Sequence, residues 1–201
     1  MIFPNGFDDE LSRSYYKNFL ACQRPETFEI FSKFIKEEAP SLIIEIGSCF
    51  GGLSYCLYDI SKKINAQFIT FDIVKNDSLS LLEKTEPNID IRIENIFDKN
   101  YTLLPEYVNY IQSFLSPILI LCDGGNKKEE YKAFSRILRR GDLLMAHDFS
   151  YNQETFESSP IWGWKEIDEN DIINSMRDNI FYYYEMSVFS QIAWVCTKKL
   201  Y

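Results

Sequence analysis

The chain has 201 residues, of which 46% are hydrophobic and 25% are charged. This composition supports one domain with a full hydrophobic core and excludes intrinsic disorder. The formal net charge of −9 argues against a nucleic-acid backbone or an anionic membrane as the main partner. The sequence shows no signal peptide and no apolar run long enough to span a membrane, so we expect a soluble, cytoplasmic protein.

The five cysteines are odd in number and form no C-x-x-C pair. This spacing favours reduced thiols packed as small hydrophobic groups over a disulfide framework. Cys49 differs from the rest because it lies within a glycine-containing turn. It has no histidine nearby in the sequence to activate it, so a nucleophilic role is disfavoured.

The hydrophobic pattern predicts helices and strands that alternate along the chain. The first forty residues are predicted to be helical in two pieces, and the second piece lies between Pro25 and Pro40. Helices are also predicted from Leu53, around Leu79–Lys84, from Pro105 and over Lys127–Arg140, with Gly141 as the C-cap. The strands predicted between them are Leu42–Ile46, Gln67–Ile73, Ile89–Ile93, Pro117–Cys122 and Asp142–Ala146.

Two further strands are predicted in the tail, Ile180–Met186 and Gln191–Thr197, separated by a short turn. Without a helix between them they should pair as an antiparallel hairpin. The prediction is therefore an α/β, Rossmann-like, doubly wound sheet of seven mostly parallel strands that ends in an antiparallel hairpin. We expect a single domain over residues 1–201, with a helical segment at 1–40 and a lid or substrate segment at 149–179.

A glycine turn follows the first predicted buried strand. Residues 42–52 read LIIEIGSCFGG, so the spacing is E-x-G-x-x-x-G and not the G-x-G-x-x-G of dinucleotide-binding folds. Glu45 would repel a pyrophosphate but accept hydrogen bonds from an amino-bearing ligand. Asp72 ends the next strand and offers two oxygens to a pair of ribose hydroxyls. The pattern favours a cationic nucleoside that carries an amino-acid tail.

Five successive predicted strands end in acids, amides or histidine. Ligands of open α/β sheets bind at this carboxyl edge. Any one of these residues alone is explained as a cap of the helix that follows, but five together indicate a site. The residues are Glu45, Asp72, Glu94 with Asn95, Asp123, and His147 with Asp148.

These motifs resemble the class I S-adenosylmethionine-dependent methyltransferases. The runs LCDGGN at 121–126 and RGDLLMAHDF at 140–149 are similar to the small-molecule O-methyltransferase branch that includes cephalosporin-hydroxylase-like and macrolide-sugar enzymes. Members of that branch typically read D-G-x-H, then a glycine pair before a strand ending in H-D or D-D. Asn126 replaces the histidine here, and Gly141-Asp142 replaces the glycine pair.

The resemblance implies roles for residues that match the motifs. Asp72 would bind the ribose of the cofactor, Asn95 would border its adenine, and Asp123 would lie near its sulfonium. Asp123 and Asp148 match the carboxylates that hold Mg²⁺ in metal-using relatives. The residues implied to border the methionine part are Glu45, Gly47, Ser48 and Gly51.

The function predicted is methyl transfer from S-adenosylmethionine to a hydroxyl of a small molecule, a sugar or a secondary metabolite. Asp123 and His147 are the catalytic candidates. A Mg²⁺ ion would lower the pKa of the hydroxyl, or His147, the single histidine, would act as general base. The alternatives for these residues are helix caps without a metal and a histidine bonded to backbone. Alternative functions are a non-catalytic ligand-binding module and a nucleotide-linked oxidoreductase.

Aromatic residues make up 16% of the chain. Trp162 and Trp164 fall in the predicted lid segment, where they would stack on the acceptor. A subunit interface in a homo-oligomer explains them equally well. The pair Lys127-Lys128 is interpreted as part of a solvated helix face.

Overall fold

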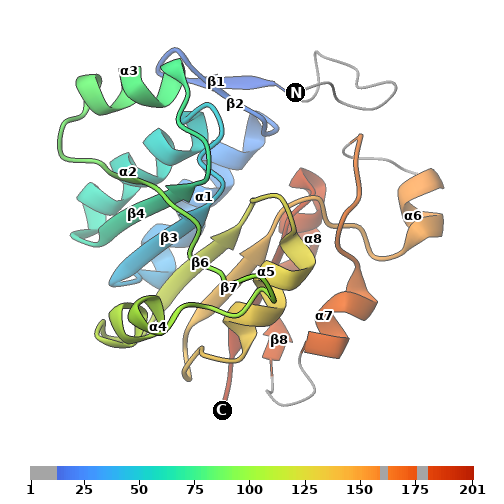
Figure 1. Ribbon diagram of the computed structural model, residues 1–201. Coiled ribbons are helices and arrows are strands. Elements are labelled where there is room, and N and C mark those ends of the chain that lie inside the picture. The colour runs from blue at the N-terminus through green and yellow to red at the C-terminus, as the bar shows by residue number, and fades with distance from the viewer. Residues whose placement is uncertain (1–12, 159–162, 176–180) are drawn as a thin grey trace.

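The computed structural model describes residues 13–158, 163–175 and 181–201. Seven strands form one sheet in the order β5-β4-β3-β6-β7-β9-β8 (Figure 1). They are β3 (Leu42–Ile46), β4 (Gln67–Asp72), β5 (Asp90–Ile93), β6 (Ile118–Cys122), β7 (Leu143–Ala146), β8 (Phe181–Tyr183) and β9 (Val195–Lys199). Strands β3 to β7 pair in parallel, whereas β9 is antiparallel to both β7 and β8. The predicted fold class is therefore confirmed.

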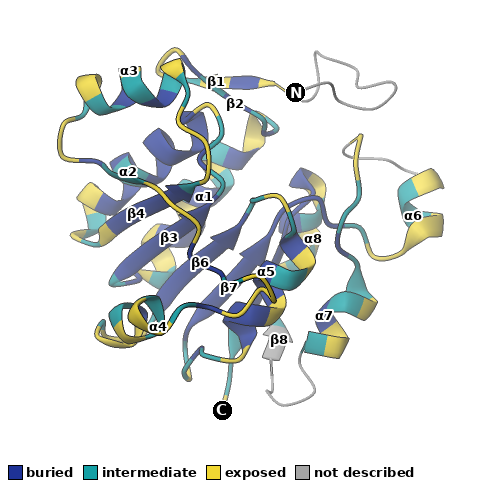
Figure 2. Cartoon of the chain, in the orientation of Figure 1, coloured by how far each residue is buried: buried dark blue, intermediate teal, exposed yellow. Residues whose placement is uncertain are grey.

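Helices cover both faces of this sheet, so its strands are the most buried part of the molecule (Figure 2). They are α1 (Glu26–Glu38), α2 (Gly52–Ile64), α3 (Asp77–Thr85), α4 (Pro105–Gln112), α5 (Lys127–Ser135), α6 (Gln153–Ser158), α7 (Glu169–Ser175) and α8 (Met186–Phe189). Within the described part of the chain, none of them has the length and apolar composition needed to cross a membrane.

Strand β3 shows how the two faces are assigned. Successive strand residues point to opposite sides, so Ile44 and Ile46 pack in the core that α4, α5 and α7 cover. Ile43 packs in the opposite core, which α1, α2 and α8 cover. Glu45 shares the side of Ile43, and this places its carboxyl group against α2 and not at the open edge of the sheet.

The prediction of helix near the N-terminus is wrong for residues 14–21. Strands β1 (Ser14–Tyr16) and β2 (Phe19–Ala21) form an antiparallel hairpin there. Lys17 and Asn18 have φ angles of 47° and 73°, as the two central residues of a tight hairpin turn require. The carbonyl oxygen of Leu20 lies 2.6 Å from the position that a Cβ on Gly52 would take, so this hairpin sits directly on the start of α2.

Two other predicted boundaries differ. Helix α5 ends at Ser135 and not at Arg140, because the Asp142 carboxylate accepts a hydrogen bond from the Arg139 backbone N–H and draws the chain into a turn. Gly141, with φ of +91°, leads that turn into β7 and does not cap α5. In the tail, α8 and a 3-10 turn over 190–192 separate β8 from β9, where a short turn was predicted. Ile180 lies outside the described residues.

Candidate functional site

The glycine turn after β3 is packed against the loop that follows β6. Gly47 has φ of +94°, and a Cβ there would lie 2.3 Å from the carbonyl oxygen of Asp123. Its backbone N–H donates to the carbonyl of Phe71, the last residue but one of β4. Gly47 is therefore required by the close approach of two backbones. That contact joins the predicted cofactor turn to the predicted catalytic loop.

Glu45 lies beneath this turn and is fully buried. Its Oε2 accepts hydrogen bonds from Ser54 Oγ at 2.5 Å and Thr70 Oγ1 at 2.6 Å. Its Oε1 has no hydrogen-bond partner among the described residues. Burial raises the pKa of Glu45 to about 8, although the two hydroxyl donors act in the opposite direction. Direct contact between Glu45 and a cofactor stays a prediction.

Asp72 stands beside the turn, as the sequence predicted. Its Oδ2 accepts from the backbone N–H of Cys49 at 2.8 Å, and its Oδ1 accepts from that of Val74 at 2.9 Å. Each carboxylate oxygen can accept more than one hydrogen bond, so both remain able to bind a ligand hydroxyl. Ser48 is buried, and its Oγ lies 2.6 Å from Thr70 Oγ1.

The other two predicted cofactor residues lie at the margins of this region. Gly51, with φ of +82°, meets the side chains of Leu79 and Leu82 of α3, so its lack of a side chain serves packing. Asn95 is exposed, and its Oδ1 accepts from the backbone N–H of Phe97.

A small cavity of about 20 Å³ lies between the hairpin and the glycine turn. It is lined on one side by Leu20 to Gln23 and on the other by Gly47, Cys49 and Asp123 among others. This is the space of about one water molecule, so a nucleoside can enter only if one of the two walls shifts.

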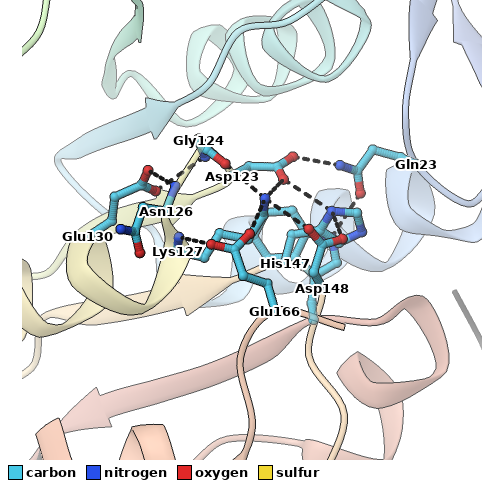
Figure 3. Close-up of polar contacts among 10 residues, drawn as sticks. Gln23, Asp123, Gly124, Asn126, Lys127, Glu130, His147, Asp148 and Glu166 are labelled. Carbon is cyan, nitrogen blue, oxygen red and sulfur yellow. Dashed lines mark hydrogen bonds and ion pairs between the residues drawn. The ribbon is translucent and has the colours of Figure 1, made fainter. Parts of the chain in front are cut away.

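The residues after β6 and β7 form a second cluster, which Figure 3 shows in close-up. The Oδ1 of Asp123 lies 3.1 Å from Nδ1 of His147, and the same nitrogen lies 3.3 Å from Oδ1 of Asp148. The Oδ2 of Asp123 accepts from Nε2 of Gln23 at 2.8 Å. The structure thus brings together the three residues that the sequence proposed for catalysis and metal binding.

His147 is only 2% exposed. Its ring stacks on Trp194 with the centroids 4.9 Å apart, and Trp194 Nε1 donates to Oε1 of Gln23 at 2.8 Å. Burial by itself lowers the pKa of His147, but the charges of Asp123 and Asp148 outweigh it and raise the pKa above its ordinary value. The two carboxylates therefore favour the protonated form of the imidazole, while burial opposes it.

Lys127 is the main residue that the sequence interpretation missed. Its Nζ lies 2.9 Å from Asp148 Oδ2 and 3.3 Å from Glu166 Oε2, and it donates to the carbonyl oxygen of Gly124 at 2.8 Å. Asp123 Oδ1 lies 3.8 Å away. The side chain is 8% exposed, so the interpretation as a solvated lysine is wrong for Lys127. Lys128 is exposed and pairs with Asp171.

The electrostatics of Lys127 follow from these contacts. Burial lowers the pKa of an ammonium group, but the charges of Asp123, Asp148 and Glu166 outweigh it, so the pKa of Lys127 is raised. The one sequence signal for this role is the position of Lys127, four residues after Asp123 and at the start of a helix.

Glu166 reaches the cluster through backbone pairing. Its N–H and that of Ile167 donate to the carbonyl oxygen of Asp148, and Phe149 forms a parallel bridge with Ile167. The backbone N–H of Lys127 donates to Glu166 Oε1 at 2.7 Å. No local sequence pattern predicts that Glu166 contacts Lys127. In the predicted lid segment, Trp164 is 46% exposed, and Trp162 lies outside the described residues.

Several solved structures share this fold at low sequence identity. A structure titled CmcI-N160 apo matches with a TM-score of 0.63 at 14% identity and covers 100% of this chain and 82% of that one. A structure titled CmcI-D160 Mg-SAM gives 0.62 at 14% identity, with coverage of 100% and 82%. A putative methyltransferase from Thermobifida fusca YX gives 0.55 at 14% identity, covering 88% of this chain and 80% of that one.

No model of a known protein family matches the sequence, and no curated protein sequence matches it. The structural likeness nevertheless defines the class of fold. The chain has the fold of the class I S-adenosylmethionine-dependent methyltransferases, including the CmcI structures. At this level of identity the likeness shows the fold alone, and the chemistry has to be argued from the residues of the site.

Replacing Gly47 by alanine should destabilise the protein by about 2–4 kcal/mol, because it combines a left-handed backbone with a backbone clash. Gly125→Ala is the matched control, since nothing lies within 4 Å of a Cβ there. Urea denaturation of both variants measures the difference. Equal stability of the two variants would show that the turn does not press on the Asp123 backbone.

Replacing Glu45 by glutamine should make stability less dependent on pH. The folded-state pKa of about 8 exceeds the ordinary 4.5, so the folded protein keeps a proton that the unfolded chain loses. The contribution of protonated Glu45 to the free energy of unfolding is fully present below pH 4.5. It is lost as the pH rises to about 8, and over this range the free energy of unfolding falls by up to ~1.4 kcal/mol per pH unit. We expect the slope to fall in Glu45→Gln but not in the exposed Glu106→Gln, as measured by denaturation from pH 5 to 8.5.

Proposed function

We propose that this protein is a methyltransferase that transfers a methyl group from S-adenosylmethionine to a hydroxyl of a small molecule. The observation that carries the proposal is the junction at Gly47. At this junction the glycine turn, whose Cys49 N–H donates to Asp72, packs directly against the loop that carries Asp123, which in turn faces His147. A nucleoside held on one side would present its reactive end to the charged cluster on the other.

The cofactor side suits a cationic nucleoside with an amino group. Asp72 has acceptor capacity for two ribose hydroxyls, and Glu45 would support from beneath the turn that borders the amino-acid part of the ligand. Carboxylates at this edge attract a sulfonium and repel the pyrophosphate of a dinucleotide. Gly47, Ser48, Gly51 and Asn95 complete the proposed border of this ligand.

When bound, S-adenosylmethionine supplies an electrophilic methyl group. We assign to Asp123 the contact with the acceptor: its carboxylate accepts a hydrogen bond from the hydroxyl and so increases its nucleophilic character. His147 is assigned as a positioning residue that holds Asp123 in place through Nδ1. A base role for His147 remains the alternative; burial lowers its pKa, but the charges of Asp123 and Asp148 outweigh burial and raise it above the ordinary value. Orientation of the hydroxyl supplies much of the expected acceleration.

The acceptor would lie under the segment 149–179, which we propose as the lid. Exposed Trp164 offers an aromatic face to a sugar or an aromatic acceptor, or to a second subunit of a homo-oligomer. A cytoplasmic location is part of the proposal. It is supported by the five cysteines, all of which are free.

Thermal shift measurements test the cofactor. Saturating S-adenosylmethionine or its demethylated product should raise the melting temperature by about 5–10 °C at ligand concentrations near 100 times Kd, whereas NAD and AMP should not. Asp72→Asn should weaken binding at least about tenfold, because the charged acceptor of the ribose is lost. Asp77→Asn is the control, since Asp77 is an exposed acid at the start of α3.

A shift with NAD but none with S-adenosylmethionine would overturn the proposal in favour of the oxidoreductase. A shift with S-adenosylmethionine, combined with no methyl transfer to any member of a panel of sugar and phenolic hydroxyls, would favour the non-catalytic binding module. Mass spectrometry of the panel, with Asp123→Asn as the inactive control, separates these outcomes.

A further inference from the structure

The fold relative titled CmcI-D160 Mg-SAM raises the question of which cation the present cluster holds. The donor chemistry of the cluster suits a cation, since three carboxylates and a backbone carbonyl converge on one point in Figure 3. The point of convergence is the Nζ of Lys127. The residues that the sequence proposed for Mg²⁺, Asp123 and Asp148, supply two of the four oxygens that surround this ammonium group.

The geometry of the cluster fits an ammonium group and not a divalent metal ion. The oxygens lie 2.8 to 3.8 Å from Lys127 Nζ, the range of hydrogen bonds and ion pairs, whereas Mg²⁺ requires oxygens at about 2.0–2.1 Å. Within the described ranges, no three histidine, cysteine, aspartate or glutamate side chains are grouped closely enough to hold a metal ion in common. A metal ion between Asp123 and Asp148 would have to displace the lysine.

The charges of the cluster also favour an ammonium group as its cation. Asp123, Asp148 and Glu166 place three carboxylates around the ammonium group of Lys127, and Asp123 and Asp148 also face the ring of His147. These side chains are largely removed from water, with exposed fractions from 3% to 20%. Carboxylates buried in this way need counter-charges, and this chain supplies them from its own side chains.

We propose that Lys127 is the resident cation of this cluster, taking the place of a divalent metal and positioning the carboxylates of Asp123 and Asp148. The three N–H groups of the ammonium are directed to Gly124, Asp148 and Glu166. Lys127 is therefore a positioning residue and does not itself contact the acceptor. The part of this inference that concerns catalysis rests on the proposed methyltransferase function, but the part that concerns the cation does not.

The test is titration of the purified protein with MnCl2, followed by electron paramagnetic resonance, and with MgCl2, followed by calorimetry. The wild type and the exposed-lysine control Lys128→Ala should bind no Mn²⁺ at this cluster. Lys127→Ala leaves three carboxylates and an empty space, so it should gain a site that binds Mn²⁺ at least ten times more tightly. Adding Asp148→Asn to Lys127→Ala should remove that gain.

Two results would overturn the proposal. One is a wild-type Mn²⁺ site that Asp148→Asn abolishes, which would show that a metal is the resident cation. The other is a folded Lys127→Ala variant with no gain in Mn²⁺ affinity. If Lys127→Ala fails to fold, the wild type and Asp148→Asn are compared instead. Negligible Mn²⁺ binding by both proteins would support Lys127 as the resident cation.

Activity gives a second readout that a merely structural lysine would not change. Methyl transfer by the wild type should withstand EDTA, whereas Lys127→Ala should become dependent on Mg²⁺. The metal titrations need neither cofactor nor acceptor, so they are readable even if S-adenosylmethionine does not bind. Failure of the proposed function and failure of this inference are therefore separate results.

Discussion

The site depends on one backbone contact, the approach of Gly47 to the carbonyl of Asp123. Strands β3 and β6 are neighbours in the sheet, so their following turns leave the same edge side by side. Because Gly47 has no Cβ, these turns can touch. This backbone contact holds Asp72, which accepts from the Cys49 N–H, and Asp123, which faces His147, in a fixed relation.

Charge organises the other half of the site. A cluster of carboxylates at the end of a parallel sheet is unstable unless positive groups accompany it. Lys127 comes from the first turn of α5, His147 from the end of β7, and Glu166 from the segment before α7. These elements are distant along the chain, and the cluster therefore also fixes how α5 and α7 sit against the sheet.

The sequence predicted the strands β3 to β7 to within one residue at each end, because their apolar runs end in polar residues or glycine. It also predicted that Asp72, Asp123 and His147 lie at the same edge of the sheet, since the parallel direction of β4, β6 and β7 determines this edge. It failed for residues 14–21, where aromatic residues fit a helix or a strand and the two-residue turn at 17–18 has no glycine. It failed for Lys127 because exposure depends on the tertiary environment: Lys127 and Lys128 are identical in type and adjacent, yet only one faces the cluster.

Gln23 connects residues that are far apart in the sequence. Its amide accepts from Trp194 and donates to Asp123, so residues 171 positions apart in the sequence share one hydrogen bond. Such distant pairs form late, because the chain between them must be ordered first. The contact of Gln23 with Asp123 therefore depends on β9 being docked beside β7, because Trp194 directly precedes this strand.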